Sequence, residues 1–566
     1  MDYHPNLADH CYILFDVLQA DKKLQQLEGF AHIDADLMRQ VMEESGKFVR
    51  DVVAPLQRVG DTIGAQYQDG AVTMPPGFTA AYQQFWRNGW AGLSTDEADG
   101  GQAMPEVLNQ ILYENLSAAN HGWTMAPGLL HGAYQCIKHH ASDALKTQYL
   151  NKVGTGEWLA TMCLTESHAG SDLGLVRTKA EPLADSSYAI SGTKIFISGG
   201  EHDLTNNIVH LVLARLPDAP PGPKGLSLFL APKFLPDDRK NSVHCDRIEE
   251  KMGLHGSPTC VMRFDAATGW LVGESGRGLG AMFVMMNSAR LHVALQGVGL
   301  LDTAWKKASA YAAERRQMRA PVRRDSTAQA DCIEEHPAIQ RVLLTQRAWI
   351  DGARVLAYHT SIEIDVAKHH ANKERRDQAN RWCALITPVM KAAFTRQAFH
   401  GGSDLLQVFG GHGYVSEWGI EQIVRDARVS MIYEGTNEIQ AIDLLVRKVI
   451  GDGGAAMAVL LSDLSTHSSS LTSLRLDVIA QLTRQIVDCN ATDLELAYWL
   501  ADDYLAACAV ALLGWAWDQI NAATSSPASA SSASIQHLRA SHKAYLRWVA
   551  PEFDKHTSII QAALHG

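Results

Sequence analysis

A change of hydrophobic period divides this chain into helical and β-rich stretches. Over residues 35–150 apolar side chains recur at helical spacing, for example in LMRQVMEESGKFVRDVVAPL. Over residues 158–273 short β-rich runs follow, separated by Gly, Pro, Asp and Asn: SSYAISGTKIFISGG, NIVHLVLARL, GLSLFLAPK and CVMRFDAA. Long helical periods return over residues 280–450 and continue to the end. This order differs from the regular strand–helix alternation of a doubly wound sheet.

The length of the chain calls for several domains. Its 566 residues are too many for one hydrophobic core. The predicted fold class is mostly α with a central β domain. We expect an N-terminal extension, a helical domain, the β domain, a second helical domain of the four-helix type and a C-terminal helical extension, at 1–34, 35–158, 159–275, 276–450 and 451–566. The Ser/Ala/Pro-rich stretch 523–534 predicts a mobile surface loop.

Charge and cysteine content exclude some classes of function. The net charge of -12 favours neither nucleic acid nor an anionic membrane surface as a partner. Nine scattered cysteines without a CxxC pair are typical of reduced thiols, so we expect a cytoplasmic protein without disulfides. The start, MDYHPNLADH, is not a secretory signal, and no run of 18 uncharged apolar residues predicts a membrane span.

Several motifs are best interpreted structurally. GESGRGLG at 273–280 is not GxGxxG and predicts a turn before a helix over 281–316, and FGGHGYVSEWG at 409–419 lacks the GK[ST] of a P-loop. There is no GxSxG. The pairs His139–His140 and His369–His370 diverge on a helix, so no metal site is expected.

Three other stretches point together to a site. TMCLTESHAGSDLG at 161–174 is a loop that can offer N–H groups and hydroxyls to a phosphate or a flavin edge. GTKIFISGG at 192–200 ends a strand with Phe196 and Ser198. SMIYEGTNEIQ at 430–440 places one carboxylate between an apolar run and a helix start. The order and spacing of the three carry more information than any one of them.

The carboxylate of the third stretch is Glu434. Gly435 turns the chain after it, and residues 437–440 resemble a capping box for the next helix. We therefore expect Glu434 on a short rigid turn. The apolar residues 431–433 would desolvate it and raise its pKa, as suits a general base.

With these motifs in this order, the chain resembles the acyl-CoA dehydrogenases over about residues 35–450. YILFDVL near the start and the helical region after 450 make the resemblance strongest to the 3-methylmercaptopropionyl-CoA dehydrogenase branch. The resemblance implies FAD wedged between the β domain and the second helical domain. It also implies electron transfer flavoprotein as electron acceptor, and a homodimer or dimer of dimers.

The resemblance also assigns roles to individual residues. Glu434 removes the α-proton of an acyl-CoA thioester while a hydride leaves Cβ for the flavin, and a backbone N–H and a flavin ribityl hydroxyl stabilise the enolate. Arg315 and Gln317 reach the FAD of a neighbouring subunit. The implied substrate contacts are Ser171, Arg290, Tyr433 and Gly435. The implied FAD contacts are Leu164, Thr165, Ser171, Phe196, Ser198, Arg315, Gln317, Gln407, Gly410, Gly411, Thr436 and Glu438.

The sequence departs from the family at several of these positions. The relatives more often carry Trp and Thr where this chain has Phe196 and Ser198, and often Gln at the position of Glu438. Ser167 replaces a usual proline, and Met318 stands where Gly or Phe is common.

Other functions remain open from the residues alone. An acyl-CoA oxidase would perform the same chemistry and pass electrons to oxygen. A DNA-associated flavoprotein of the alkylation-response type is disfavoured, because residues 451–566 hold 6 Lys and Arg against 11 Asp and Glu. Trp499, Trp515 and Trp517 in that region predict a packed core instead. The acyl group stays undetermined between short methylthio-acyl and medium straight chains.

Overall fold

The N-terminal part of the molecule is helical. The computed structural model describes residues 3–323, 325–524 and 533–565. Every residue of α6 is buried, and the helix is kinked at Asn120, whose φ and ψ are −158° and 88°. The helices of this part are α1 (Leu7–Cys11), α2 (Ala20–Leu24), α3 (Ala35–Phe48), α4 (Gln57–Ile63), α5 (Phe78–Arg87), α6 (Glu106–Thr124), α7 (Leu130–His140), α8 (Asp143–Leu145) and α9 (Asn151–Gly154).

The first residues of the chain are held in the core by buried polar contacts. The Tyr3 hydroxyl donates to Asp302 at 3.2 Å, and the Tyr358 hydroxyl lies 2.8 Å from His10 Nδ1. Arg354, fully buried, pairs with Asp302 and with Glu114. The opposite charges compensate one another, whereas a lone buried charge would be costly.

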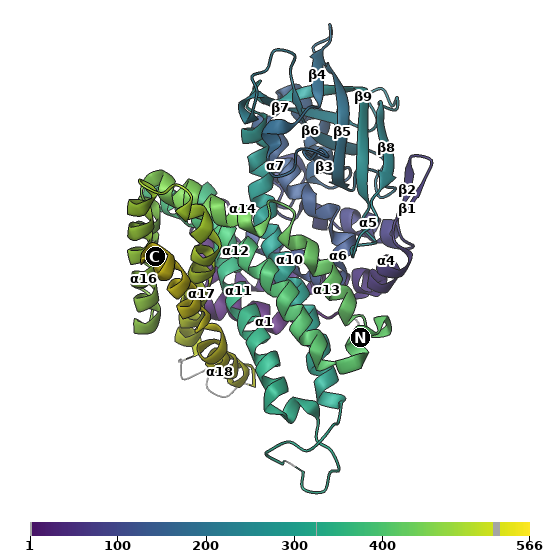
Figure 1. Cartoon of the computed structure of the whole chain (residues 1–566). Helices are drawn as coiled ribbons and strands as arrows, with labels where there is room; N and C mark the ends of the chain where they lie inside the picture. The colour runs from purple at the N-terminus through teal and green to yellow at the C-terminus, as the bar shows by residue number, and fades with distance from the viewer. Residues whose placement is uncertain (1–2, 324, 525–532, 566) are drawn as a thin grey trace.

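A mixed sheet follows, at the top of Figure 1. The pairings β6–β4, β4–β5, β5–β9, β9–β7 and β7–β6 form a closed circuit, with β3 parallel to β6 and β8 added on β9. The β-rich runs predicted from the sequence are confirmed as strands. These are β3 (Leu159–Cys163), β4 (Lys179–Pro182), β5 (Tyr188–Ser198), β6 (Ile208–Arg215), β7 (Leu226–Pro232), β8 (Val243–Ile248) and β9 (Thr259–Val272); β1 (Gln66–Gln68) and β2 (Ala71–Thr73) form a separate hairpin.

Long helices form the body below the sheet (Figure 1). They are α10 (Gly278–Glu314), α11 (Pro337–His369) and α12 (Lys373–Val408), with the shorter α13 (Ile420–Arg428) and α14 (Asn437–Ile442). The helix predicted over 281–316 is confirmed with shifted bounds. It ends before Arg315 because that residue takes an extended conformation, with φ −70° and ψ 122°.

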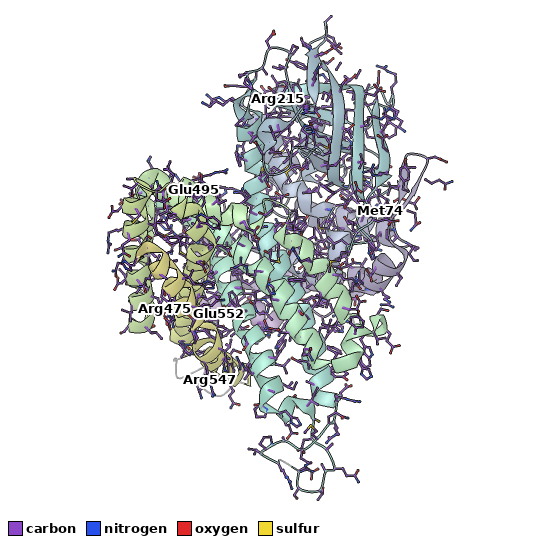
Figure 2. The ribbon with its side chains drawn as sticks, in the orientation of Figure 1. Met74, Arg215, Arg475, Glu495, Arg547 and Glu552 are labelled. Carbon is purple, nitrogen blue, oxygen red and sulfur yellow. The ribbon has the colours of Figure 1, made fainter. Side chains whose placement is uncertain are left out.

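The C-terminal helices pack against this body. Trp517 on α17 is fully buried and donates through Nε1 to the Ala348 carbonyl of α11 at 3.2 Å. Arg475 on α16 donates to the Tyr545 hydroxyl at 3.0 Å (Figure 2). The helices are α15 (Ala455–Ser465), α16 (Ser470–Asn490), α17 (Leu496–Thr524), α18 (Ala533–Ala544) and α19 (Glu552–His565).

The prediction of a packed core holds for two of the three tryptophans in this region. Trp515 and Trp517 are 7% and 0% exposed, but Trp499 is 78% exposed. The prediction was wrong for Trp499 because it lies in the first turn of α17, before the part of the helix that packs on α11. Of the loop predicted at 523–534, residues 525–532 lie outside the described residues, and its ends belong to α17 and α18.

One described helix, α17, is long and apolar enough to cross a membrane by length and composition alone. Its most apolar window has a mean hydropathy of 1.4, and 72% of that window is buried inside the fold. This burial is what the core helix of a packed domain shows, since a lipid-facing helix would expose its apolar side chains.

Candidate active site

Glu434 lies on a strained turn directly before α14. Its φ is +56°, and Gly435 follows with φ +83°. A left-handed backbone at a residue other than glycine costs on the order of 1–3 kcal/mol and persists only where the surroundings enforce it. The prediction of a short rigid turn is therefore supported by the backbone conformation.

The cap of α14 differs from the predicted one. Thr436, not Asn437, is the N-cap, and its hydroxyl accepts from Ile439 N at 3.3 Å. The capping box expected over residues 437–440 was wrong by one residue. Asn437 is unavailable as a cap because its side-chain oxygen accepts from Lys391, at 3.1 Å.

Lys391, a buried lysine of α12, forms hydrogen bonds to this turn. Its Nζ donates to the Gly435 carbonyl at 2.7 Å as well as to Asn437. Gln440 of α14 donates to the Glu434 carbonyl at 2.9 Å. Side chains from two helices thus bind consecutive carbonyls of the turn, which accounts for how its unfavourable conformation is maintained.

The environment of Glu434 suits a base. Burial raises the pKa of its carboxyl to about 7, against the opposing effect of the positive charges of Arg290 and Lys391. Burial likewise lowers the pKa of Lys391 to about 7, and the carboxylate of Glu434 opposes that shift. A carboxylate with a pKa near neutrality takes up and releases protons readily at physiological pH.

Two predicted substrate contacts lie beside this carboxyl. Arg290 on α10 is 5% exposed and pairs with Asp443 at 3.4 Å. The Tyr433 hydroxyl donates to Gln296 Oε1 of α10 at 2.6 Å. The structure therefore brings Arg290, Tyr433, Glu434 and Gly435 together, whereas Ser171, also predicted as a substrate contact, lies exposed in the loop after β3.

In the β domain a bulge exposes Phe196. The register of β5 against β9 shifts between Lys194 and Ile197, and Phe196 takes a φ of +59°. Bulges re-aim side chains, and this one leaves the aromatic ring 60% exposed at the end of the strand. Ser198, two residues on, is partly buried. An exposed phenyl ring at this position suits contact with a flat ring system.

The loop after β3 is fixed against the same strand. Lys194, fully buried on β5, donates to the Leu164 carbonyl at 3.0 Å and to Glu166 Oε1 at 2.9 Å. Ile195 N donates to the Thr165 carbonyl at 2.9 Å. Leu164, Thr165 and Phe196, predicted as flavin contacts, are therefore neighbours in space.

The β domain and the Glu434 turn both contact the segment that directly follows α6. A Cβ at Gly199, directly after β5, would lie 3.5 Å from the Ala126 side chain. The preceding residue, Met125, lies with its sulfur 3.9 Å from the Tyr433 hydroxyl. The segment after α6 thus joins the two groups of predicted contacts.

Five of the predicted FAD contacts lie at the other end of α10, whereas Thr436 and Glu438 lie at the start of α14. Arg315 and Gln317 follow the last turn of α10, and both are exposed. Tyr311, in that turn, stacks on Phe409 at 4.4 Å between ring centroids, next to the glycine turn that follows α12. Gln407 lies in the last turn of α12, and Gly410 and Gly411 lie in the glycine turn; all three are exposed.

This distal group is separated from Glu434 by most of a long helix. Arg290, whose charge acts on Glu434, lies on α10, and Arg315 follows directly after this helix, 25 residues later, or about 37 Å along the axis. The chain therefore gathers its predicted contacts in two places, not one.

Sequence reasoning missed Lys391 and the two buried partners of the Tyr433 hydroxyl, His121 and Gln296. The signal for Lys391 was present, because a single lysine interrupts the apolar run ITPVMKAAF. Buried lysines are rare and need partners, so such a residue is a candidate for a site.

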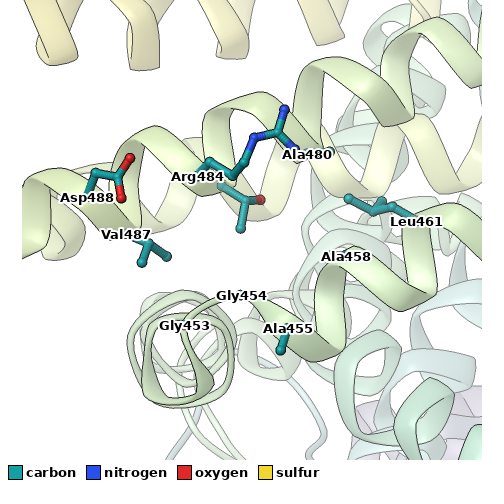
Figure 3. A pocket seen from close by; sticks show the side chains of 10 residues that line it. Gly453, Gly454, Ala455, Ala458, Leu461, Ala480, Arg484, Val487 and Asp488 are labelled. Atoms are coloured by element: carbon teal, nitrogen blue, oxygen red, sulfur yellow. The ribbon is translucent and has the colours of Figure 1, made fainter.

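A cavity of about 240 Å³ lies elsewhere, in the C-terminal region (Figure 3). It lies between the start of α15 and the face of α16, and Arg484 and Asp488 are its charged lining residues. It contains none of the predicted site residues.

A helical layer, a β domain and long helices follow one another along the chain, and a carboxyl of raised pKa lies on the turn before α14. The chain belongs to the acyl-CoA dehydrogenase family, whose N-terminal, middle and C-terminal domain models match residues 36–157, 161–267 and 276–449. It is accordingly an FAD-dependent oxidoreductase that dehydrogenates acyl-CoA.

The chain is also similar to individual members of this family. The chain is 45% identical over 438 residues to 3-methylmercaptopropionyl-CoA dehydrogenase of Ruegeria pomeroyi, which covers 76% of this chain and 74% of that protein. It is 36% identical over 475 residues to the broad-specificity linear acyl-CoA dehydrogenase FadE5 of Mycobacterium tuberculosis, covering 81% and 77%. The structure of Caenorhabditis elegans ACDH-11 in complex with C11-CoA has the same fold, with a TM-score of 0.75 at 19% identity over 99% of this chain and 96% of that one.

The residues present fit FAD. Phe196 offers an exposed ring beside the fixed loop at Leu164 and Thr165. At the distal group, a Cβ on Gly410 or Gly411 would meet no atom within 4 Å, which leaves room for a ligand against the backbone. The solved structure of an acyl-CoA dehydrogenase from Bacillus anthracis, similar in fold with a TM-score of 0.73, is a complex with FAD.

Proposed function

We propose that Glu434 is the base that removes the α-proton of a short-to-medium acyl-CoA, with a 3-methylthiopropionyl group as a candidate. The observation that carries this proposal is the turn itself: a carboxyl with a pKa near 7, held in a strained conformation by Lys391. The relative from Ruegeria pomeroyi supports the candidate acyl group.

In this mechanism the chain holds the thioester and moves one proton. Glu434 Oε takes the proton from Cα, and the charge that develops on the thioester oxygen needs donors. The backbone N–H of Glu434 is available as a donor to this oxygen, because no described group accepts a hydrogen bond from it. The chemistry that FAD supplies when bound is acceptance of a hydride from Cβ.

The test of the substrate class is anaerobic reduction of the yellow enzyme by a panel of acyl-CoAs. We expect rapid bleaching by acyl groups of three to eight carbons and by 3-methylthiopropionyl-CoA. Bleaching by very long chains alone would contradict the proposal. Comparing electron transfer flavoprotein with oxygen as acceptor separates a dehydrogenase from an oxidase, and we expect electron transfer flavoprotein to be preferred.

Lys391→Met should move the pH dependence of flavin reduction. The positive charge of Lys391 lowers the pKa of Glu434, so its removal raises that pKa above about 7. Since the base must be deprotonated, the rate should fall at pH 7 and recover at higher pH. Stopped-flow reduction across pH 6–9 measures the midpoint.

Lys373→Met is the matched control, because Lys373 is an exposed lysine at the start of the same helix. Its midpoint should equal that of the wild type. An unchanged midpoint in Lys391→Met as well would show that Lys391 has no effect on the base.

A further inference from the structure

Residues 164–178 join β3 to β4, and we call them the β3–β4 loop. The tip of this loop, residues 170–172, is exposed, and the backbone N–H groups there donate to no described group. Consecutive free N–H groups in a loop suit the binding of a phosphate or another acceptor. The tip is therefore the part of the loop that a ligand can reach, and its position decides how that ligand is bound.

The base of the β3–β4 loop is fixed by Glu166. The Glu166 carboxylate accepts hydrogen bonds from Arg177 N at 2.8 Å and from Thr178 N at 3.0 Å. The Thr178 hydroxyl donates to the same carboxylate at 2.6 Å. These bonds join the two ends of the loop where it leaves and re-enters the sheet. They leave the position of the tip to other contacts.

Arg215, labelled in Figure 2, is the last residue of β6 and contacts the β3–β4 loop just after its tip. The guanidinium donates through Nε to the Val176 carbonyl at 2.7 Å and through Nη2 to the Gly174 carbonyl. It also donates to the carbonyls of Pro220 and Gly222, each at 3.0 Å. One side chain thus binds two carbonyls of the β3–β4 loop and two of the loop between β6 and β7. The planar fork of donors of an arginine suits such a bridge.

The β6–β7 loop, residues 216–225, supports this bridge. It contains four prolines, and each fixes one backbone φ angle. The two loops also touch directly, because a Cβ on Gly174 would lie 3.2 Å from the Pro223 side chain and 3.4 Å from the Gly222 backbone. Since the β6–β7 loop has little conformational freedom, the bonds of Arg215 fix the β3–β4 loop relative to the sheet.

We propose that Arg215 is a positioning residue, which holds the β3–β4 loop so that Ser171 and the free N–H groups at the tip meet bound FAD and acyl-CoA. The inference rests on the proposed function, since it takes Ser171 as a contact of both ligands. Four of the five N–H donors of Arg215 bind carbonyls, so the residue acts through the loop. Without these bonds the loop samples other conformations, and only a fraction of the molecules is ready to bind.

Arg215→Met tests this in the full chain. We expect the dissociation constant of FAD and the KM for butyryl-CoA to rise about 10- to 100-fold, because an apparent dissociation constant varies inversely with the fraction of molecules in the binding conformation. The kcat at saturating FAD and butyryl-CoA should change by less than about 3-fold, as for the loss of binding that is uniform along the reaction. Fluorescence titration of the apoprotein with FAD and steady-state kinetics measure these constants.

A merely structural role of Arg215 would give a different result. The melting temperature of Arg215→Met would fall while the FAD dissociation constant and the KM kept their wild-type values, and the inference would be overturned. Arg215→Lys keeps the charge but loses the fork, so it should show a smaller rise in both constants. Should Arg215→Met not fold, wild-type constants in Arg215→Lys would overturn the inference.

Arg263→Met is the control, because Arg263 lies on β9 of the same sheet and pairs with Asp246 of β8 at 3.2 Å. Both constants should match those of the wild type. Failure of every acyl-CoA to reduce the flavin of the unmodified enzyme would overturn the proposed function. The FAD dissociation constant of Arg215→Met would still test the present inference, because it needs no turnover.

Discussion

Glu434→Gln should abolish most flavin reduction by acyl-CoA while leaving the protein folded and yellow. The amide keeps the size of the side chain but cannot accept the α-proton, and loss of a positioned base costs roughly 10²–10⁴-fold in rate. The loss should appear in the reductive half-reaction, measured by anaerobic stopped flow. Binding of acyl-CoA, measured by the perturbation of the flavin spectrum, should persist.

Glu417→Gln is the matched control for this variant. Glu417 is an exposed carboxylate in the segment before α13, and its substitution should change the rate by no more than about 0.5 kcal/mol of activation free energy. A Glu434→Gln enzyme that reduces its flavin at near wild-type rate would place the base elsewhere.

Glu434→Gln should also show a gain in stability that depends on pH. The folded-state pKa of Glu434, about 7, exceeds the ordinary value of 4.5, so the folded state binds more protons than the unfolded state between these pH values. Stability of the wild type therefore falls as the pH rises through this window. Glu434→Gln removes that dependence, and its melting temperature relative to wild type should be higher at pH 8 than at pH 4.5.

Arg315→Ala should weaken FAD retention about 10- to 150-fold. We propose that Arg315 binds the pyrophosphate of FAD held by a second subunit, where a charge-assisted hydrogen bond contributes about 1.5–3 kcal/mol. Its exposed side chain, and its position about 37 Å from Arg290 along the axis of α10, favour that use over a contact with FAD bound beside Glu434 of the same chain. The dissociation constant of FAD measures the weaker retention, and the molar mass in solution shows whether the variant is still an oligomer.

Arg316→Ala provides the comparison, since Arg316 is the next residue and also exposed. Its guanidinium donates to the Ala330 carbonyl at 3.2 Å, within its own loop. The Arg316→Ala variant should therefore retain FAD as the wild type does. Unchanged FAD content of Arg315→Ala in a monodisperse monomer would refute the role in a second subunit.

The sequence alone predicted the order of helical and β-rich stretches because hydrophobic period is a local property of the chain. β6 and β7, for example, coincide with NIVHLVLARL and GLSLFLAPK. The exposed position of Phe196 could not be predicted in this way. It depends on a bulge that forms only when β5 pairs with β9.

The site was predicted in part. The position of Glu434 followed from its motif, but its partner Lys391 lies 43 residues earlier and meets it only when α12 packs under the turn. Similarly, the Tyr433 hydroxyl, in the segment before α14, contacts His121 of α6 and Gln296 of α10. Contacts of this kind depend on tertiary packing and leave no periodic pattern.

The buried contacts of the first residues have a consequence for how this protein is made. Tyr3 and His10 bond to residues 299 and 348 positions later. At a synthesis rate of about 5–20 residues per second, His10 waits roughly 20–70 s on the ribosome before Tyr358 exists. The earliest part of the chain can thus reach one partner, Asn115, early, but completes its native contacts late. During that interval the acidic groups of α6 and α10 lack their arginine, so the body of the enzyme closes only when α11 has been translated.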